Sequence, residues 1–184
     1  PAVEPDGLGS SDEVVAHRRD HLGRVRALME RADVFVFTLG LTETWADRQS
    51  GRVYPTCPGV VAGHYDPNRH VFRNTTYPEV VADLVAVRRL LKTHNPDARL
   101  VLTVSPVALV ATATAGHVLA ATTHSKATLR AAAGDLAAAE ADVDYVPSYD
   151  LIAGAPAGGR FFSADKREVT AAGVEAAMLS LIHI

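Results

Sequence analysis

Hydrophobic residues recur along the chain at two spacings, and segments of the two kinds alternate. In some segments they lie three or four residues apart, as on the buried face of a helix; in shorter segments they are nearly continuous, as in strands covered on both faces. Helices are predicted over about 11–31, 77–94, 125–140 and from about 170, and strands over 33–40, 99–104 and 143–146. Buried positions are predicted at Val15, Leu22, Val25 and Leu28 of the first helix, at Leu129, Ala133 and Leu136 of the third, and at Val174 and Met178 of the last.

The order of these elements predicts the fold class. Alternating helices and strands are typical of an α/β protein with a parallel sheet between two helical layers, a three-layer α/β/α arrangement. Ligands bind such sheets at the carboxyl ends of the strands, so we expect a site around 40–45, 105–109 and 147–150. The segment 46–74 is rich in Pro, Gly, Asn, Asp and His without a period, and we expect it to be a long functional loop over that site.

Composition narrows the possible functions. The chain has 184 residues, 48% of them hydrophobic, which suits one domain with a core of its own. The formal charge of −3 gives no polycationic surface for nucleic acid or an anionic membrane, and no apolar run reaches the roughly 20 residues of a membrane span. A single cysteine excludes an internal disulfide and a multi-cysteine zinc site. No secretory leader is visible, so a cytoplasmic location is favoured, and no cofactor is expected.

The first candidate site is the segment from Gly40 to Trp45, at the end of the first strand. Glycine at a strand exit lets a ligand approach the backbone, and its N–H could donate to an oxyanion together with Thr42. An ordinary turn capped by Thr42 explains the same residues, and composition alone favours that simpler reading.

Other candidates carry titratable groups. His117 precedes the third helix and could be a general base or a helix cap, while Asp165 could orient a catalytic histidine or cap the last helix. Cys57 could be a nucleophile, but a small side chain in a proline-framed loop is the preferred interpretation. His64, Asp66 and His70 match no metal-site spacing, so ordinary loop hydrogen bonding is preferred and no metal is predicted.

Taken together, several unusual segments resemble the GSCFA family. The first two are Phe-Thr-Leu-Gly-Leu-Thr-Glu-Thr-Trp at 37–45 and Tyr-Pro-Thr-Cys-Pro-Gly at 54–59. The match continues in order through 103–107, 117–118, 125–126, 147–149 and Asp165. The resemblance covers about residues 12–178. It implies a flavodoxin-like fold of the SGNH hydrolase type and serine esterase or acyltransferase chemistry on an acyl ester, possibly of a carbohydrate.

The resemblance also implies roles for single residues. Gly40 and Thr42 would bind the oxyanion, and Glu43, Trp45, Ser105 and His64 would line the substrate site. The superfamily pattern Asp-x-x-His corresponds to Asp165, but Glu168 stands where the histidine is expected. Glu168 or His117 would then handle protons, or the lineage has lost hydrolysis and is a binding module of the same fold. The sequence leaves these alternatives open, together with the oligomeric state.

The resemblance and the chain ends predict an incomplete domain. The sequence contains no Gly-Ser-Cys-Phe-Ala and begins with Pro1, so the nucleophilic serine and the first strand of the sheet are expected to precede it. Residues 179–184 read as a translated sequencing adapter and are expected to be a non-native tail. We therefore expect one domain over 1–178 that lacks its N-terminal part.

Overall fold

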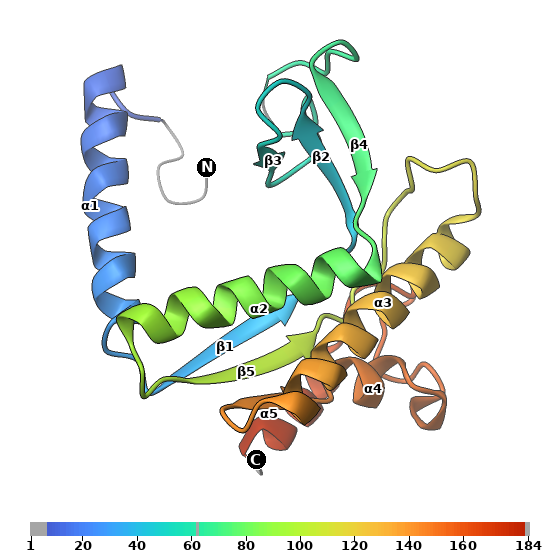
Figure 1. The fold of residues 1–184 in the computed structure, drawn as a ribbon. Coiled ribbons are helices and arrows are strands. Elements are labelled where there is room, and N and C mark those ends of the chain that lie inside the picture. The colour runs from blue at the N-terminus through green and yellow to red at the C-terminus, as the bar shows by residue number, and fades with distance from the viewer. Residues whose placement is uncertain (1–6, 62, 183–184) are drawn as a thin grey trace.

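The computed structural model describes residues 7–61 and 63–182, which form two small sheets and several helices (Figure 1). A parallel sheet consists of β1 (Val34–Leu39), β5 (Arg99–Val104) and β6 (Val143–Val146), in that order. An antiparallel sheet consists of β3 (Val53–Tyr54), β2 (Glu43–Asp47) and β4 (His70–Asn74). The helices are α1 (Ser11–Met29), α2 (Tyr77–His94), α3 (Val118–Ala139), α4 (Ser148–Ala153) and α5 (Ala171–Ile182), with a 3₁₀ turn at Ala155–Ala157.

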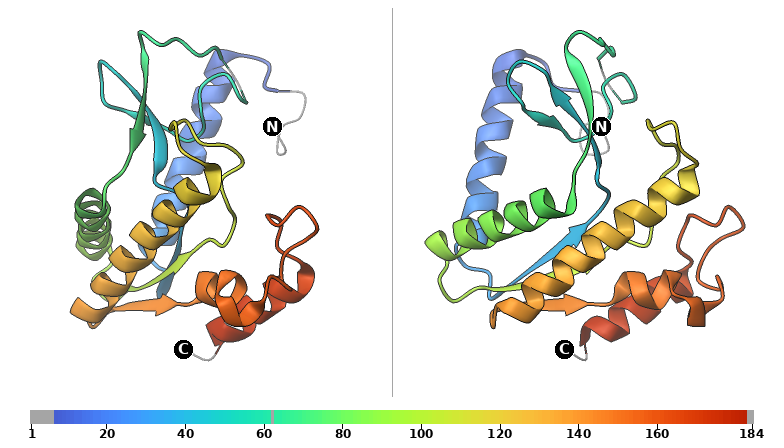
Figure 2. Two further views of the ribbon diagram at one scale, coloured as in Figure 1. Left: turned by 90° about the vertical axis from the view of Figure 1, so that its right-hand side faces the viewer. Right: turned by 45° about the vertical axis from the view of Figure 1, so that its right-hand side comes forward.

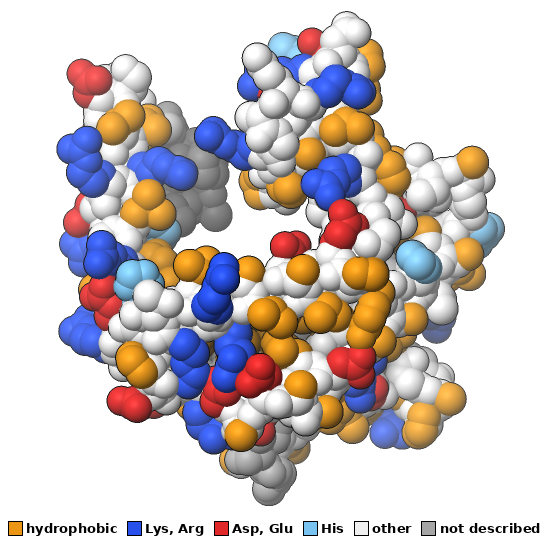
Figure 3. Space-filling model, viewed as in Figure 1, with side chains coloured by type: hydrophobic (Ala, Val, Ile, Leu, Met, Phe, Trp, Pro, Cys, Tyr) orange, Lys and Arg blue, Asp and Glu red, His pale blue; other side chains and the backbone are white. Residues whose placement is uncertain are grey.

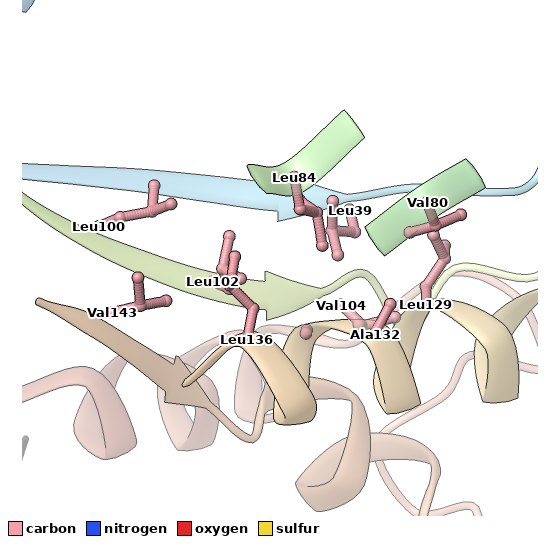
Figure 4. Packing of buried hydrophobic residues seen from close by; sticks show 11 residues of the cluster. Leu39, Val80, Leu84, Leu100, Leu102, Val104, Leu129, Ala132, Leu136 and Val143 are labelled. Carbon is pink, nitrogen blue, oxygen red and sulfur yellow. The ribbon is translucent and has the colours of Figure 1, made fainter. Parts of the chain in front are cut away.

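The parallel sheet lies between two helical layers, which confirms the predicted α/β class. Successive side chains of a strand point to opposite faces, so Leu100, Leu102 and Val104 of β5 share one face, where α2 and α3 cover them. Leu84 and Leu129 pack there with them, and the cluster forms the core shown in Figure 4. Thr103 faces the other way, toward α4, and α5 packs against α4 on that side (Figure 2).

Local sequence signals place the ends of α2 as predicted. Thr76 and Glu79 form a capping box, in which the Glu79 carboxylate accepts a hydrogen bond from the Thr76 N–H at 2.8 Å. The helix ends at His94, before Asn95 and Pro96, because proline disfavours helical backbone in the residue before it. The start of α2 is thereby fixed at the carboxyl-end side of the sheet, beside β4.

The antiparallel sheet corrects the prediction of an irregular loop over 46–74. β4 pairs along the whole of β2, from Glu43↔Asn74 to Asp47↔His70. Trp45 packs edge-on against Phe72 and Tyr65, with ring centroids 5.5 and 5.2 Å away. These contacts join residues more than 19 positions apart in the sequence, so no local hydrophobic periodicity predicts them.

Two predicted buried faces are wrong. The helix α1 has no buried residue, and Val15, Leu22 and Leu28 are each at least half exposed, because the helix stands away from the sheet (Figure 1). In α5, Val174 and Met178 are half exposed, and Gly173 is the buried residue instead. The predicted stripe of α3 is confirmed, since Leu129, Ala133 and Leu136 are all buried.

Two boundaries also differ from the predictions. The helix α3 begins at Val118 rather than near 125, because its first two turns project beyond the sheet and lack the buried stripe that marks the rest. The short helix α4 follows β6 directly and was not predicted. None of the helices within residues 7–61 and 63–182 combines the length and the hydrophobicity that a membrane span requires.

Candidate functional site

The carboxyl ends of β1 and β5 lie side by side, as expected of a parallel sheet. The Ser105 N–H donates to the Leu39 carbonyl oxygen at 2.8 Å, which places Ser105 next to Gly40. The Ser105 hydroxyl accepts a hydrogen bond from the Val107 N–H at 3.2 Å and so shapes the turn that follows β5. Two of the predicted site residues, Gly40 and Ser105, are thus brought together.

Two consecutive residues of α3, Ser125 and Lys126, form hydrogen bonds with the segment that follows β1. The Lys126 ammonium donates to the Gly40 carbonyl oxygen at 2.7 Å, and the Ser125 hydroxyl accepts from the Thr42 N–H at 2.8 Å. Both side chains are fully buried, Lys126 being 1% exposed and Ser125 0%. Burial lowers the pKa of Lys126 from 10.5 to about 8, because the charged form is separated from water. We call these two residues the α3 clamp.

The hydrogen bonds of the clamp determine which polar groups of residues 40–42 remain free to bind a ligand. Gly40 is exposed, and its N–H has no hydrogen-bond partner among the described residues. The Thr42 N–H is taken by Ser125, and the Thr42 hydroxyl oxygen is buried without a hydrogen-bond partner. Gly40 therefore keeps the donor that the sequence suggested, whereas the backbone of Thr42 has a structural role.

Glu43 orders a loop rather than facing open space. Its carboxylate accepts hydrogen bonds from the Thr112 hydroxyl at 2.5 Å and from the Ala113 N–H at 3.3 Å. The same loop is held to α3 by the Leu109 N–H, which donates to the Thr122 hydroxyl at 3.2 Å. The loop between β5 and α3 is therefore attached both to β2 and to α3.

Asp165 occupies a tight turn before α5. One of its carboxylate oxygens accepts the N–H groups of Arg167 and Glu168, each at 3.0 Å, and these bonds lower the pKa of Asp165. The Arg167 guanidinium donates to the Ala108 carbonyl oxygen at 3.1 Å, so this turn lies against the segment that follows β5. Asp165 and Glu168 are thus attached to the edge of the site by Arg167.

His117 caps the N-terminal end of α3, about two turns before the clamp. Its Nδ1 accepts a hydrogen bond from the Leu119 N–H at 3.2 Å, which leaves Nε2 as the remaining nitrogen. Ser125 follows eight residues later in the helix, and at 1.5 Å per residue this is about 12 Å along the axis. The structure does not bring His117 to Gly40.

Trp45 and His64 belong to the antiparallel sheet and its long connection. Trp45 lies in β2, within the aromatic cluster described above, and His64 is exposed before Tyr65. His70 is buried, and its Nδ1 accepts a hydrogen bond from the Asp66 N–H at 3.0 Å, which agrees with ordinary loop bonding. Among residues 7–61 and 63–182, no group of His, Cys, Asp or Glu is arranged to hold a metal ion.

A cavity of about 220 Å³ opens between the segment 40–42 and α2. Its wall is mainly apolar, with Leu39 and Leu41 on the strand side and Val80 and Leu84 on the helix side. Thr42 lines it as well. In Figure 3, hydrophobic side chains are exposed over the layer of α2 and α3, below the projecting antiparallel sheet.

The contacts that the α3 clamp makes with Gly40 and Thr42 were not predicted. A signal existed, because Lys126 lies three residues before Leu129 and ten before Leu136, which puts it on the apolar face of the helix. Lysine is almost never fully buried unless it is paired, so a lysine in a buried stripe indicates a specific acceptor. Which acceptor it meets depends on the tertiary structure.

Comparison with known protein families identifies the family to which the segments of this site belong. The profile of the GSCFA family matches residues 5–180, which is most of the chain and includes every element of the site. A search of curated proteins finds no match. The resemblance inferred from 37–45, 103–107 and the later segments is confirmed: the chain belongs to the GSCFA family.

Proposed function

We propose that the complete protein is a serine-type ester hydrolase or acyltransferase of the SGNH kind, acting on an acyl ester such as an acylated carbohydrate. The observation that carries the proposal is the N–H of the exposed residue Gly40, at the carboxyl end of β1, which has no hydrogen-bond partner among residues 7–61 and 63–182. A fixed donor at this edge of a parallel sheet stabilises negative charge that develops on a carbonyl oxygen.

In the proposed reaction, a serine hydroxyl attacks the acyl carbonyl and its proton passes to a base. The tetrahedral oxyanion is bound by the Gly40 N–H, then collapses with loss of the alcohol, which takes the proton. Water or an acceptor hydroxyl attacks the acyl-enzyme in the same way and restores the serine. No Gly-Ser-Cys-Phe-Ala occurs in the sequence, so on this proposal the serine comes from outside these 184 residues.

The proposal assigns the proton transfer to Glu168 rather than to His117. Glu168 belongs to the turn that Arg167 attaches to Ala108, beside the segment after β5. His117 lies about 12 Å along α3 from the clamp and uses Nδ1 as a helix cap. Glu168→Gln should lower kcat by about 100-fold or more, within the range of general acid–base catalysis. His117→Asn, which keeps a capping side chain, should leave kcat unchanged.

A matched pair of glycine variants tests the oxyanion donor in the complete gene product. A Cβ at Gly40 meets no atom within 4 Å, so Gly40→Ala should fold and keep its activity on p-nitrophenyl acetate. Gly40→Pro removes the N–H and should lower kcat by roughly 100-fold or more. Equal activity in the two variants, or no labelling of the wild type by a fluorophosphonate, would contradict the proposal.

A second function, a binding module without catalysis, is favoured by one observation. The Asp165 carboxylate is engaged by two backbone N–H groups of its own turn, and Glu168 replaces the histidine that such a carboxylate would orient. On this alternative the complete protein binds an acetylated sugar in calorimetry and releases no acetate. Release of acetate that depends on Gly40 excludes it.

A further inference from the structure

The α3 clamp holds the two peptide units on either side of Leu41, one by its carbonyl and the other by its N–H. Lys126 holds the Gly40 carbonyl and Ser125 holds the Thr42 N–H, so the two residues that flank Leu41 are both attached to the same turn of α3. The side chains that hold them are both fully buried, so neither bond is exposed to competition from water. The segment 40–42 is therefore attached to α3 at both of its ends.

The direction of the Leu41 N–H follows from this attachment. In a trans peptide the N–H points away from the carbonyl oxygen of the preceding residue, and the described chain contains no cis peptide. The Gly40 carbonyl points down to Lys126, so the Leu41 N–H points away from α3. Like the Gly40 N–H, it has no hydrogen-bond partner among the described residues.

The charge of Lys126 acts on the same peptide unit. No carboxylate of residues 7–61 or 63–182 forms an ion pair with the Lys126 ammonium, and the Gly40 carbonyl is its acceptor. A charged donor on a carbonyl polarises the peptide group, and this strengthens the N–H at its other end. A buried cation without a paired carboxylate also lowers the electrostatic free energy of a negative charge that develops nearby.

We propose that Ser125 and Lys126 are positioning residues of an oxyanion-binding loop, and that Lys126 holds and polarises the Gly40–Leu41 peptide so that the Leu41 N–H donates to the oxyanion beside the Gly40 N–H. The proposal rests on the acyl-transfer function proposed above. It adds a second backbone donor to the proposed oxyanion site. It also assigns a role to Lys126, a buried lysine that takes no part in the proposed proton transfer.

The alternative is a clamp that only stabilises the fold. A purely structural clamp would change the free energy of unfolding and leave the turnover of the folded protein as it was. Lys92 provides a control, because its ammonium also bonds backbone carbonyls, those of Pro96 and Ala98, each at 2.8 Å, at the opposite end of the sheet; unlike Lys126 it also pairs with a carboxylate, that of Asp142. Lys92→Met removes a comparable link without touching 40–42.

The first measurement tests the clamp and needs no activity. Amide exchange of the complete gene product, followed by ¹H–¹⁵N NMR, should show the Thr42 N–H exchanging at least about tenfold faster in Ser125→Ala, because its acceptor is gone. In Lys126→Met the Leu41 amide resonance should shift, and in Lys92→Met neither change should occur. Unchanged Thr42 protection in Ser125→Ala together with an unchanged Leu41 resonance overturns the clamp.

The second measurement tests the role of the clamp in catalysis. For hydrolysis of p-nitrophenyl acetate, Lys126→Met should lower kcat by about tenfold to 100-fold while KM stays unchanged, as expected when a transition-state donor is weakened. If Lys126→Met does not fold, Ser125→Ala carries the same expectation. An unchanged kcat overturns the positioning role even though esterase activity stands.

The two failures are distinguishable. If the wild-type protein neither hydrolyses the ester nor reacts with a fluorophosphonate, the proposed function fails and the positioning role falls with it. The exchange measurement still decides in that case whether Ser125 and Lys126 hold the loop.

Discussion

Asp142, just before β6, shows how a single ionised group ties the helical layer to the sheet. Its carboxylate accepts hydrogen bonds from the Arg88 guanidinium at 2.5 Å and pairs with the Lys92 ammonium at 3.0 Å, both on α2. The hydrogen bond from Arg88 is the largest cause that lowers the pKa of Asp142, from 3.8 to about 2, and the bond from Lys92 adds to it.

This pKa predicts a pH-dependent stability. The contribution of Asp142 is complete above its unfolded pKa of about 4 and is lost as the pH falls from about 4 to about 2, because the unfolded chain then binds the proton first. Asp142→Asn should therefore flatten the fall in the free energy of unfolding over this range, measured by urea denaturation. Asp144→Asn, at the exposed pair with Arg99, is the control and should leave the slope nearly unchanged. If the free energy of unfolding falls equally steeply with pH in wild type and Asp142→Asn, the bonds of Asp142 to Arg88 and Lys92 do not cause the acid sensitivity.

Gly173 gives a second prediction at the scale of the residue. A Cβ there would lie 2.7 Å from Cγ1 of Val169 and 3.0 Å from Cβ of Phe161, closer than packed atoms allow. Gly173→Ala should lower the free energy of unfolding by about 1–3 kcal/mol, as overpacking does. Gly23→Ala in α1 is the control, because its Cβ meets no atom within 4 Å, and it should stabilise by about 0.5–1 kcal/mol. Thermal denaturation distinguishes the two, and equal shifts in the same direction would refute the packing argument.

Between elements, the extent of burial separates α1 from α3. The helix α1 has no buried residue, whereas α3 buries Leu129, Ala132, Ala133 and Leu136 against the sheet and α2. Helices shorter than roughly 12–15 residues are marginal in water, and longer ones still draw most of their stability from packing. Amides of α1 should therefore exchange at least about 100-fold faster than those around Leu129, by hydrogen exchange with mass spectrometry. Equal protection of the two helices would mean that α1 is packed in solution.

The same contrast explains how far the sequence could predict the fold. The strands β5 and β6 were predicted to the residue: β5 from its nearly continuous apolar run, and β6 from the apolar residues around Asp144 and the proline that follows Val146. The capping box of α2 is equally local. The stripe of α1 shows that an amphipathic period identifies a helix but not the partner that covers it. The strands β2 and β4 are joined by pairing across a long connection, and no local pattern encodes that pairing.

The candidate site follows the same rule. Gly40 and Ser105 could be found because the carboxyl ends of parallel strands meet, which depends only on the order of the elements. The clamp of Ser125 and Lys126 could not, because the acceptor of a buried ammonium is a carbonyl 86 residues away in the sequence. Residue types in a motif give the chemistry that is available, and the tertiary contacts decide which groups are used and which remain free.

Across the whole molecule, the helical layers cover the parallel sheet unevenly. The helix α4 packs against β5 and α5 packs against α4, whereas α1 stands away from the sheet, as both views in Figure 2 show. Val34 and Val36 point to the face of α4 but are 49% and 47% exposed. The strand β1 pairs with β5 along one edge, and no strand of the described residues pairs with its other edge.

An unpaired edge that carries exposed valines is a template for pairing with another chain. We therefore predict that the 184-residue protein self-associates through β1. Val36→Lys should weaken this association by about tenfold or more, because it replaces an exposed valine that the contact would bury with a charged side chain. Val60→Lys is the control: Val60 is 74% exposed but lies in the connection between β3 and β4, outside any strand. Sedimentation velocity over a concentration series measures both. If Val36→Lys and Val60→Lys reduce association equally, general charge and not the strand edge controls it; if neither does, the free edge of β1 is not where the molecules meet.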